Sequence, residues 1–180
     1  MNYKKYLAIF SALIILISFG CEKADKLTQF EMEYTETVII PSSTGINLPF
    51  NFLTPDISTN AESTFEVNDT RKDMVEEINL IKLDLTHTSP AGGDLGFLKS
   101  IKVYISAEDL PEKMIASKED IPSNVGKYLE IETSNENLKD YIIKDKFSLR
   151  VNTVTDEAFN SDQHIDVHTV FFVDAKVLGN

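Results

Sequence analysis

The sequence has no tryptophan, only one cysteine, and few glycines and prolines, which number 7 and 6 among 180 residues. A single cysteine, Cys21, cannot form an internal disulfide or supply a cysteine-based metal cluster. The chain must therefore fold on its apolar core alone, which is feasible because a chain of ~150 residues buries roughly 70% of its unfolded surface. The sequence contains no internal repeat, coiled-coil heptad or long low-complexity segment.

Basic residues are also few. Lysine and arginine number 17 against 29 aspartates and glutamates, which gives a formal net charge of −12 at pH 7. Nucleic acids and anionic lipid headgroups are bound through clustered lysine and arginine, and an excess of acids repels both. The composition therefore excludes nucleic acid as a partner.

The N-terminus holds the longest uncharged apolar run near a chain end. Residues 6–19 carry no charge and follow Lys4 and Lys5. The run is too short to span a hydrocarbon layer of ~30 Å, which takes about 20 helical residues. A positive start, a short apolar stretch and the small Gly20 before Cys21 are typical of a secretory signal peptide.

Residues 17–21, Ile-Ser-Phe-Gly-Cys, resemble the lipobox of bacterial lipoproteins. They depart from the usual pattern at Ser18, where leucine is common, and at the bulky Phe19. The resemblance implies cleavage before Cys21 by signal peptidase II, followed by attachment of a diacylglyceryl thioether and an N-acyl chain. Each buried methylene contributes roughly 0.8 kcal/mol, so three acyl chains are expected to hold the protein on a membrane. An uncleaved membrane anchor and a secreted protein with an incidental cysteine are the alternatives.

The same resemblance predicts an outer-membrane, lipid-anchored location on either the periplasmic or the cell-surface face. Glu22 follows the cysteine, which under lipoprotein sorting rules implies release to the outer membrane, and residues 22–26 resemble short charged export tags. Removal of the leader would take away two lysines and no acid, leaving 15 basic and 29 acidic residues and a formal charge of −14.

Three segments are expected. Residues 1–20 form the lipoprotein signal peptide, and residues 21–28 form the lipidated cysteine and a polar tether. At ~3.3 Å per residue the part of the tether after Cys21 spans roughly 20 Å when extended. Residues 29–180 form a single β domain.

Alternation of apolar and polar residues predicts an all-β domain. Short runs with period 2 and turn residues between them favour strands. They lie at residues 30–40, 46–52, 63–67, 81–85, 101–105, 114–116, 128–132, 147–151 and 165–177. Short helices are expected at residues 69–77 and 134–143, with one helical turn at 95–98. This pattern predicts an antiparallel two-sheet β-sandwich, immunoglobulin-like, with about eight or nine strands and two or three short helices.

Two residues indicate sheet edges. Glu36 has the same parity as the apolar residues of the first strand, where a buried carboxylate without a partner is costly. The strand is therefore expected to bend, bulge or reach an edge there. Pro49 cannot donate to a ladder, so the second strand is also predicted to lie at an edge.

The histidines offer the main candidate site. His164, Asp166 and His168 occupy alternate positions of the last strand, so their side chains share one face with neighbours roughly 6.5–7 Å apart. Such a row can supply two or three zinc ligands, with a fourth from elsewhere. The opposite parity is almost wholly apolar, however, which favours a solvated strand face. His87 has the parity of Leu83 and is expected to end a strand.

Other chemistry has weaker support. Asp156, Glu157 and Asp162, together with Asp166, form an acidic group around one loop, but the spacing of an EF-hand calcium loop is missing. Carboxylate pairs for glycoside hydrolysis depend on spatial separation, and no pair stands out. There is no G-x-S-x-G serine elbow. No cofactor is expected.

The leading hypothesis is a non-enzymatic cell-envelope lipoprotein. Its β-sandwich would bind or adhere to a protein or glycan partner at the cell surface through loops or an edge strand, while Cys21 holds it to the membrane. A metal- or ligand-binding envelope protein that uses the row of His164, Asp166 and His168 is the first alternative. A glycan-processing accessory protein or hydrolase is the second.

Overall fold

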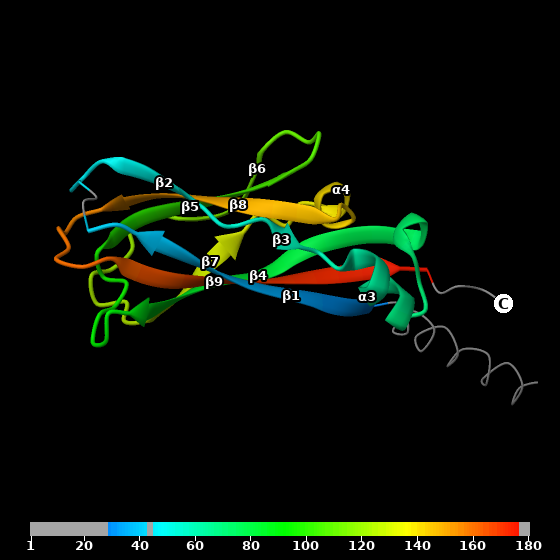
Figure 1. The fold of residues 1–180 in the computed structure, drawn as a ribbon, viewed down its shortest axis with the longest axis horizontal. Coiled ribbons are helices and arrows are strands. Elements are labelled where there is room, and N and C mark those ends of the chain that lie inside the picture. The colour runs from blue at the N-terminus through cyan, green and yellow to red at the C-terminus, as the bar shows by residue number, and fades with distance from the viewer. Residues whose placement is uncertain (1–28, 43–44, 177–180) are drawn as a thin grey trace, which may run out of the picture.

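A computed structural model describes residues 29–42 and 45–176, and these form a mostly antiparallel β structure with short helices (Figure 1). The elements, in chain order, are β1 (Gln29–Ile40), β2 (Pro49–Leu53), β3 (Ile57–Ser58), α3 (Ala61–Val67), the 3-10 turn η2 (Lys72–Met74), β4 (Val75–Ser89), β5 (Leu98–Ala107), β6 (Lys113–Lys118), β7 (Tyr128–Thr133), α4 (Lys139–Ile142), β8 (Lys146–Thr155) and β9 (Gln163–Ala175). The all-β prediction is thus confirmed.

The strands belong to one continuous sheet in the order β1-β9-β4-β7-β6-β5-β8-β2, and β3 pairs with β8 beside β2. The sheet is curled like a half-barrel, so that the β1-β9-β4 part lies opposite the β2-β8-β5 part (Figure 1). A sandwich of two separate sheets is not confirmed. The two parts are joined because β6 pairs with β7, through Ala116 opposite Thr133 and Ser117 opposite Glu132.

The core fills the inside of this curl. Strand β9 shows how the sequence builds it, because its residues alternate between buried and half-buried from Gln163 to Thr169. Its fully buried Phe171 packs edge-to-face against Phe147 of β8, with ring centres 5.9 Å apart. Each large apolar side chain buried in this way contributes about 1.5–3 kcal/mol.

The curl is tied across its open side by Tyr34 of β1. Its ring lies edge-to-face on Phe147 at 5.2 Å and on Phe171 at 5.9 Å. Its hydroxyl donates a hydrogen bond of 2.8 Å to the carbonyl oxygen of Thr59, just after β3. Burial raises the pKa of the Tyr34 hydroxyl, so the group stays a neutral donor.

Both predicted edges are confirmed, since β1 and β2 are the outermost strands of the described sheet. Glu36 lies opposite Val167 in a β1–β9 register without shifts, so the strand accommodates the charge at an edge rather than by a bulge. The Glu36 side chain is half-buried and faces the same side as Val38. Pro49 begins β2, whose only strand partner in the described part of the chain is β8.

The strand predicted at residues 63–67 is wrong, because that segment forms helix α3. Its β-branched and aromatic residues favour a strand locally, but Ala61 and Phe65, four apart, are the buried pair. Phe65 packs edge-to-face on Phe30 of β1 at 6.0 Å. Tertiary burial at helical spacing therefore outweighs the local β preference.

The helix predicted at residues 69–77 is also wrong. Only the three residues of η2 are helical, and β4 begins at Val75. Val75 pairs with Ala175 and Ile78 with Val173, with a register shift between them. This β-bulge interrupts the period-2 pattern and gives the strand the spacing of a short helix.

The second predicted helix is shorter than expected. Only Lys139–Ile142 is helical, as α4, rather than all of residues 134–143. Leu138, Tyr141 and Ile142 are buried together, as their spacing predicts. The predicted helical turn at residues 95–98 is a hydrogen-bonded turn that leads into β5.

Antiparallel pairing places the connections at two opposite ends of the curl. The β1–β2, β4–β5, β6–β7 and β8–β9 connections lie at one end, called here the loop end (Figure 1). The start of β1, the end of β9 and α3 lie at the other, called here the terminal end (Figure 1). η2 lies there too, because the Lys176 N–H donates to the carbonyl oxygen of Met74 at 2.9 Å. Among the helices of the described segments, none combines the length and apolar character needed to cross a membrane.

Candidate functional site

The predicted row of His164, Asp166 and His168 lies on the outer face of β9, and all three residues are half-buried. Asp166 and His168 are engaged with different neighbouring strands. Asp166 accepts a 2.6 Å hydrogen bond from the hydroxyl of Thr37 on β1. His168 Nδ1 lies 2.9 Å from an Asp84 carboxylate oxygen on β4. The shared face is confirmed, but the side chains do not converge on one point.

Within the ranges the structure describes, no three histidine, cysteine, aspartate or glutamate side chains gather closely enough to hold a metal ion. Asp162 of the acidic loop instead accepts a 2.8 Å hydrogen bond from the backbone N–H of Ser42. Metal binding by the β9 row stays a prediction, and the geometry of the protein lends it no support.

His168 belongs to a charged network across the sheet. Asp84 lies at its centre with a side chain only 6% exposed, 2.9 Å from Lys82 Nζ and 2.9 Å from His168 Nδ1. His168 Nε2 also lies 3.7 Å from Glu33 of β1. Burial raises the pKa of Asp84, but hydrogen bonds from His168 and Lys82 outweigh that effect and leave the pKa below its usual value. The network joins β1, β9 and β4, which is a structural role.

His87 is buried at the end of β4, on the inner face as predicted. Its Nε2 lies 3.0 Å from Gln163 Oε1, and its Nδ1 has no hydrogen-bond partner among residues 29–42 and 45–176. A side chain at Gly93 would place a Cβ 2.5 Å from the imidazole ring. Gly93 therefore makes room for the ring, and His87 fills the core rather than a ligand site.

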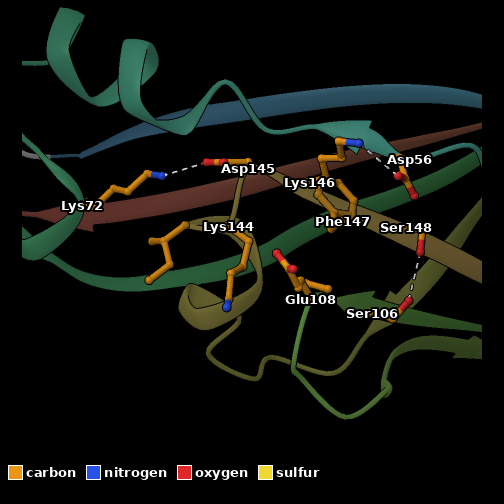
Figure 2. Close-up of a pocket in the computed structure, with 11 residues that line it drawn as sticks. Asp56, Lys72, Ser106, Glu108, Lys144, Asp145, Lys146, Phe147 and Ser148 are labelled. Carbon is orange, nitrogen blue, oxygen red and sulfur yellow. Dashed lines mark hydrogen bonds and ion pairs between the residues drawn. The ribbon is translucent and has the colours of Figure 1, made fainter.

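A polar pocket of about 540 Å³ opens where α4, β8 and the end of β5 meet (Figure 2). Lys72 Nζ pairs with Asp145 at 3.2 Å, and Lys146 Nζ pairs with Asp56 at 3.4 Å. The charged residues of its lining are Asp56, Lys72, Glu108, Lys144, Asp145 and Lys146. Three positive and three negative groups favour no ligand of either sign. The lining holds no histidine or cysteine, and its two serines, Ser106 and Ser148, lie within hydrogen-bond distance of each other at 3.0 Å.

The loop end carries a different feature, which we call the uncharged segment: residues 37–55. It contains no charged residue over 19 positions, in a chain that is 26% charged. It forms the end of β1, the β1–β2 connection and all of β2. Its exposed large hydrophobic side chains are Ile39, Ile46, Leu48 and Leu53, which are 47%, 45%, 58% and 69% exposed. These four are half of the large hydrophobic residues recorded as exposed in the described ranges.

Sequence reasoning passed over this segment, although the signal was available. Periodicity predicts strands and turns in this part of the chain but is insensitive to charge, and Glu36 and Asp56 bound the longest uncharged run after residue 20. Large contiguous apolar patches mark interaction surfaces, whereas single exposed hydrophobic residues are common. The four side chains here belong to one uncharged stretch of the chain. Cys21, the predicted lipidation site, lies outside the described residues.

Comparison with known proteins identifies no family. No protein-family profile matches the chain, and no curated protein sequence matches it. Among solved structures, a protein of Desmodium yellow mottle tymovirus is similar at 10% identity and a TM-score of 0.31, over 84% of this chain and 91% of that one. The acidic stable capsid of Helicobacter pylori bacteriophage KHP30 gives 10% identity and 0.32, over 80% and 92%.

A third similar structure is CpGH89CBM32-5 from Clostridium perfringens in complex with GalNAc-beta-1,3-galactose. It shares 9% identity at a TM-score of 0.31, over 80% of this chain and 97% of that one. Likenesses at this level carry no argument about the function of this protein.

Proposed function

We propose that this protein is a non-enzymatic lipoprotein of the cell envelope that binds a partner protein through the uncharged segment. The lipobox-like residues 17–21 support the anchor, and the outer membrane is the expected location. The mature charge of −14 keeps the remaining surface away from anionic lipids and nucleic acid. An uncharged apolar segment on such a surface is suited to a protein partner.

The main support for this proposal is the position of the uncharged segment relative to Gln29. Gln29 begins β1 at the terminal end, whereas the β1–β2 connection lies at the loop end (Figure 1). Residues 21–28 can bridge at most roughly 30 Å at ~3.6 Å per residue. An anchor at Cys21 therefore holds the terminal end towards the membrane and turns the loop end away from it.

The aliphatic character of the segment favours protein over glycan. Its four exposed large hydrophobic side chains are isoleucine and leucine, which offer no flat aromatic platform for a sugar ring. The sequence as a whole has no tryptophan. A glycan partner would need exposed aromatic and polar side chains together, and the segment supplies amides and hydroxyls without a platform.

The anchor is tested by comparing the full-length protein with Cys21→Ser in a bacterial host. Intact-mass measurement should find the wild-type chain cleaved before Cys21 and heavier by three acyl groups, in the outer-membrane fraction. The Cys21→Ser variant should carry no acyl mass. A wild-type protein recovered free of lipid would remove the anchor from the proposal.

The binding surface is tested by position-specific photo-crosslinking in whole cells. A photoreactive residue replaces Leu48 in the uncharged segment or, as a matched control, Val67 on α3, which is 79% exposed. The proposal predicts a defined product from position 48 that is lost when Leu53→Asp is added, and no such product from position 67. Equal products from both positions would contradict it.

A further inference from the structure

The free side of β2 has the features of a strand acceptor. Resting on the proposed function, we propose that the partner contributes an extended, uncharged segment that pairs with β2 as an additional strand of the sheet. Peptide recognition of this kind gains affinity from backbone hydrogen bonds at an open sheet edge and specificity from alternate side chains.

The backbone of β2 offers the necessary groups. Thr54 donates from its N–H to the carbonyl oxygen of Leu149 at 2.9 Å. In an antiparallel pair such bonded positions alternate, so Phe52 and Phe50 turn their N–H and C=O groups towards β8. Asn51 and Leu53 then turn theirs to the free side. In the ranges the structure describes, no strand pairs with that side.

The edge is held in place before any partner arrives. The amide oxygen of Asn51 accepts hydrogen bonds from Arg150 Nη1 at 2.5 Å and from Asn152 Nδ2 at 3.0 Å. Arg150 in turn makes two bonds to Glu112, at 2.7 and 2.6 Å, and lies 4.0 Å from the centre of the Tyr104 ring. A fixed edge lowers the ordering cost of association, because only the incoming segment loses conformational freedom.

The side chains of β2 define the chemistry of the incoming segment. Phe50 and Phe52 are half-buried on the inner face, while Leu53 is exposed on the outer face. β2 itself carries no charge, and the neighbouring Arg150 is already paired with Glu112. The fitting partner is therefore a strand with apolar residues facing the side of Phe50 and Phe52, over about 17 Å at ~3.4 Å per residue.

A second copy of this chain is a poor occupant. Two bodies of charge −14 repel one another, which opposes self-association. In an antiparallel β2–β2 pair centred on Asn51, Leu53 of one copy would face Pro49 of the other, and proline has no N–H to return a hydrogen bond. The incoming strand therefore belongs to a different protein.

Hydrogen–deuterium exchange of backbone amides tests this arrangement on the full-length protein in mild detergent. In the free protein the amides of Phe50 and Phe52 should exchange slowly, and those of Asn51 and Leu53 rapidly. The probe is a set of random peptides displayed on phage, selected for binding and then synthesised. With the bound peptides, the amides of Asn51 and Leu53 should become protected by at least about tenfold.

Two variants at one position separate backbone from side-chain effects. Leu53→Pro removes an outward N–H and leaves the β8 ladder intact, whereas Leu53→Thr removes the leucine side chain and keeps the N–H. Peptide affinity should fall roughly tenfold further in Leu53→Pro than in Leu53→Thr, because the lost N–H leaves a carbonyl group of the peptide without a hydrogen bond. Equal affinities in the two variants would overturn the inference.

The outcomes distinguish a failure of strand addition from a failure of the proposed binding surface. Peptides that bind and protect the uncharged segment, but leave the Asn51 and Leu53 amides exchanging rapidly, would overturn strand addition while leaving the binding surface intact. Selected peptides that map to another surface, or no selected peptide at all, would overturn both. The exchange measurement on the wild-type protein does not depend on whether either variant folds.

Discussion

The two outermost strands of the described sheet end it in opposite ways. β1 has 12 residues and carries Glu31, Glu33 and Glu36, the last of which faces inward. β2 has five residues and no charge. Natural sheets discourage edge-to-edge pairing with charged side chains, including charges that point inward, and also with short edge strands and prolines. β1 carries the charges, whereas β2 has only its short length and Pro49 at its first position, so the rest of β2 is able to pair.

The same two strands also differ in how firmly they are fixed to the core. Tyr34 of β1 packs against Phe147 and Phe171 and bonds to the Thr59 carbonyl. Phe52 of β2 is half-buried and lies beside a cavity of about 10 Å³ that Val38 and Ile40 of β1 also line. The difference between the two strands therefore lies in the aromatic contacts and the hydrogen bond of Tyr34, not in the cavity.

The largest expected effect comes from removing these two rings. Tyr34→Ala should lower the free energy of unfolding by about 3 kcal/mol or more, because it removes two aromatic contacts and a hydrogen bond. Phe52→Ala should cost about 1–2 kcal/mol, since the ring is half-buried and beside a cavity. Chemical denaturation followed by circular dichroism measures both. A larger cost for Phe52→Ala would reverse the comparison.

A smaller effect is expected behind the β1 edge, at Asp84. Its pKa lies below the usual value in the folded state, so its stabilisation is present above about pH 4 and is lost as the pH falls through the folded pKa. Asp84→Asn should lower the unfolding free energy at neutral pH by about 1–3 kcal/mol, since a charged acceptor is lost. Denaturation between neutral and acidic pH should then show a shallower pH dependence than the wild type.

Glu112, whose partner Arg150 lies on β8 beside β2, is the matched control for Asp84. Glu112 pairs with Arg150, yet its side chain is 39% exposed against 6% for Asp84. Exposed pairs contribute about 1 kcal/mol or less. Glu112→Gln should therefore change the unfolding free energy little. A cost equal to that of Asp84→Asn would mean that burial of the carboxylate does not set the difference.

The sequence predicts most strands because their periodicity is local. The alternation from Ile165 onwards defines β9. Glu36, a charge at an apolar position, and Pro49, which lacks an N–H, identify the two edge strands. The start of β4 is missed because a bulge after Val75 disrupts the alternation. Helix α3 is missed because its burial depends on Phe30, a residue of another element.

The joining of the sheet and the candidate surface are harder to predict. Two residue pairs between β6 and β7 turn two expected sheets into one, and pairing between distant segments leaves no periodic signal. The row of His164, Asp166 and His168 shares a face as predicted, but its partners Thr37 and Asp84 come from strands that only the fold brings beside β9. The uncharged segment is visible in the sequence, and Pro49 predicts that its second strand lies at an edge. The pairing of that strand with β8 and the exposure of Leu53 are known only from the fold.

The smallest expected change in stability is at Glu36. Glu36→Val continues the apolar parity of β1 beside Val38, so the unfolding free energy should change by only about 1 kcal/mol or less. The inward charge that protects the edge is lost, however, and self-association should appear as the concentration rises in sedimentation velocity. Glu36→Gln, which removes the charge but keeps a polar group, should associate less. If Glu36→Val stays monomeric wherever the wild type does, the protection of β1 must come from Glu31 and Glu33 instead, and the contrast between the two edges would depend on the outer face alone.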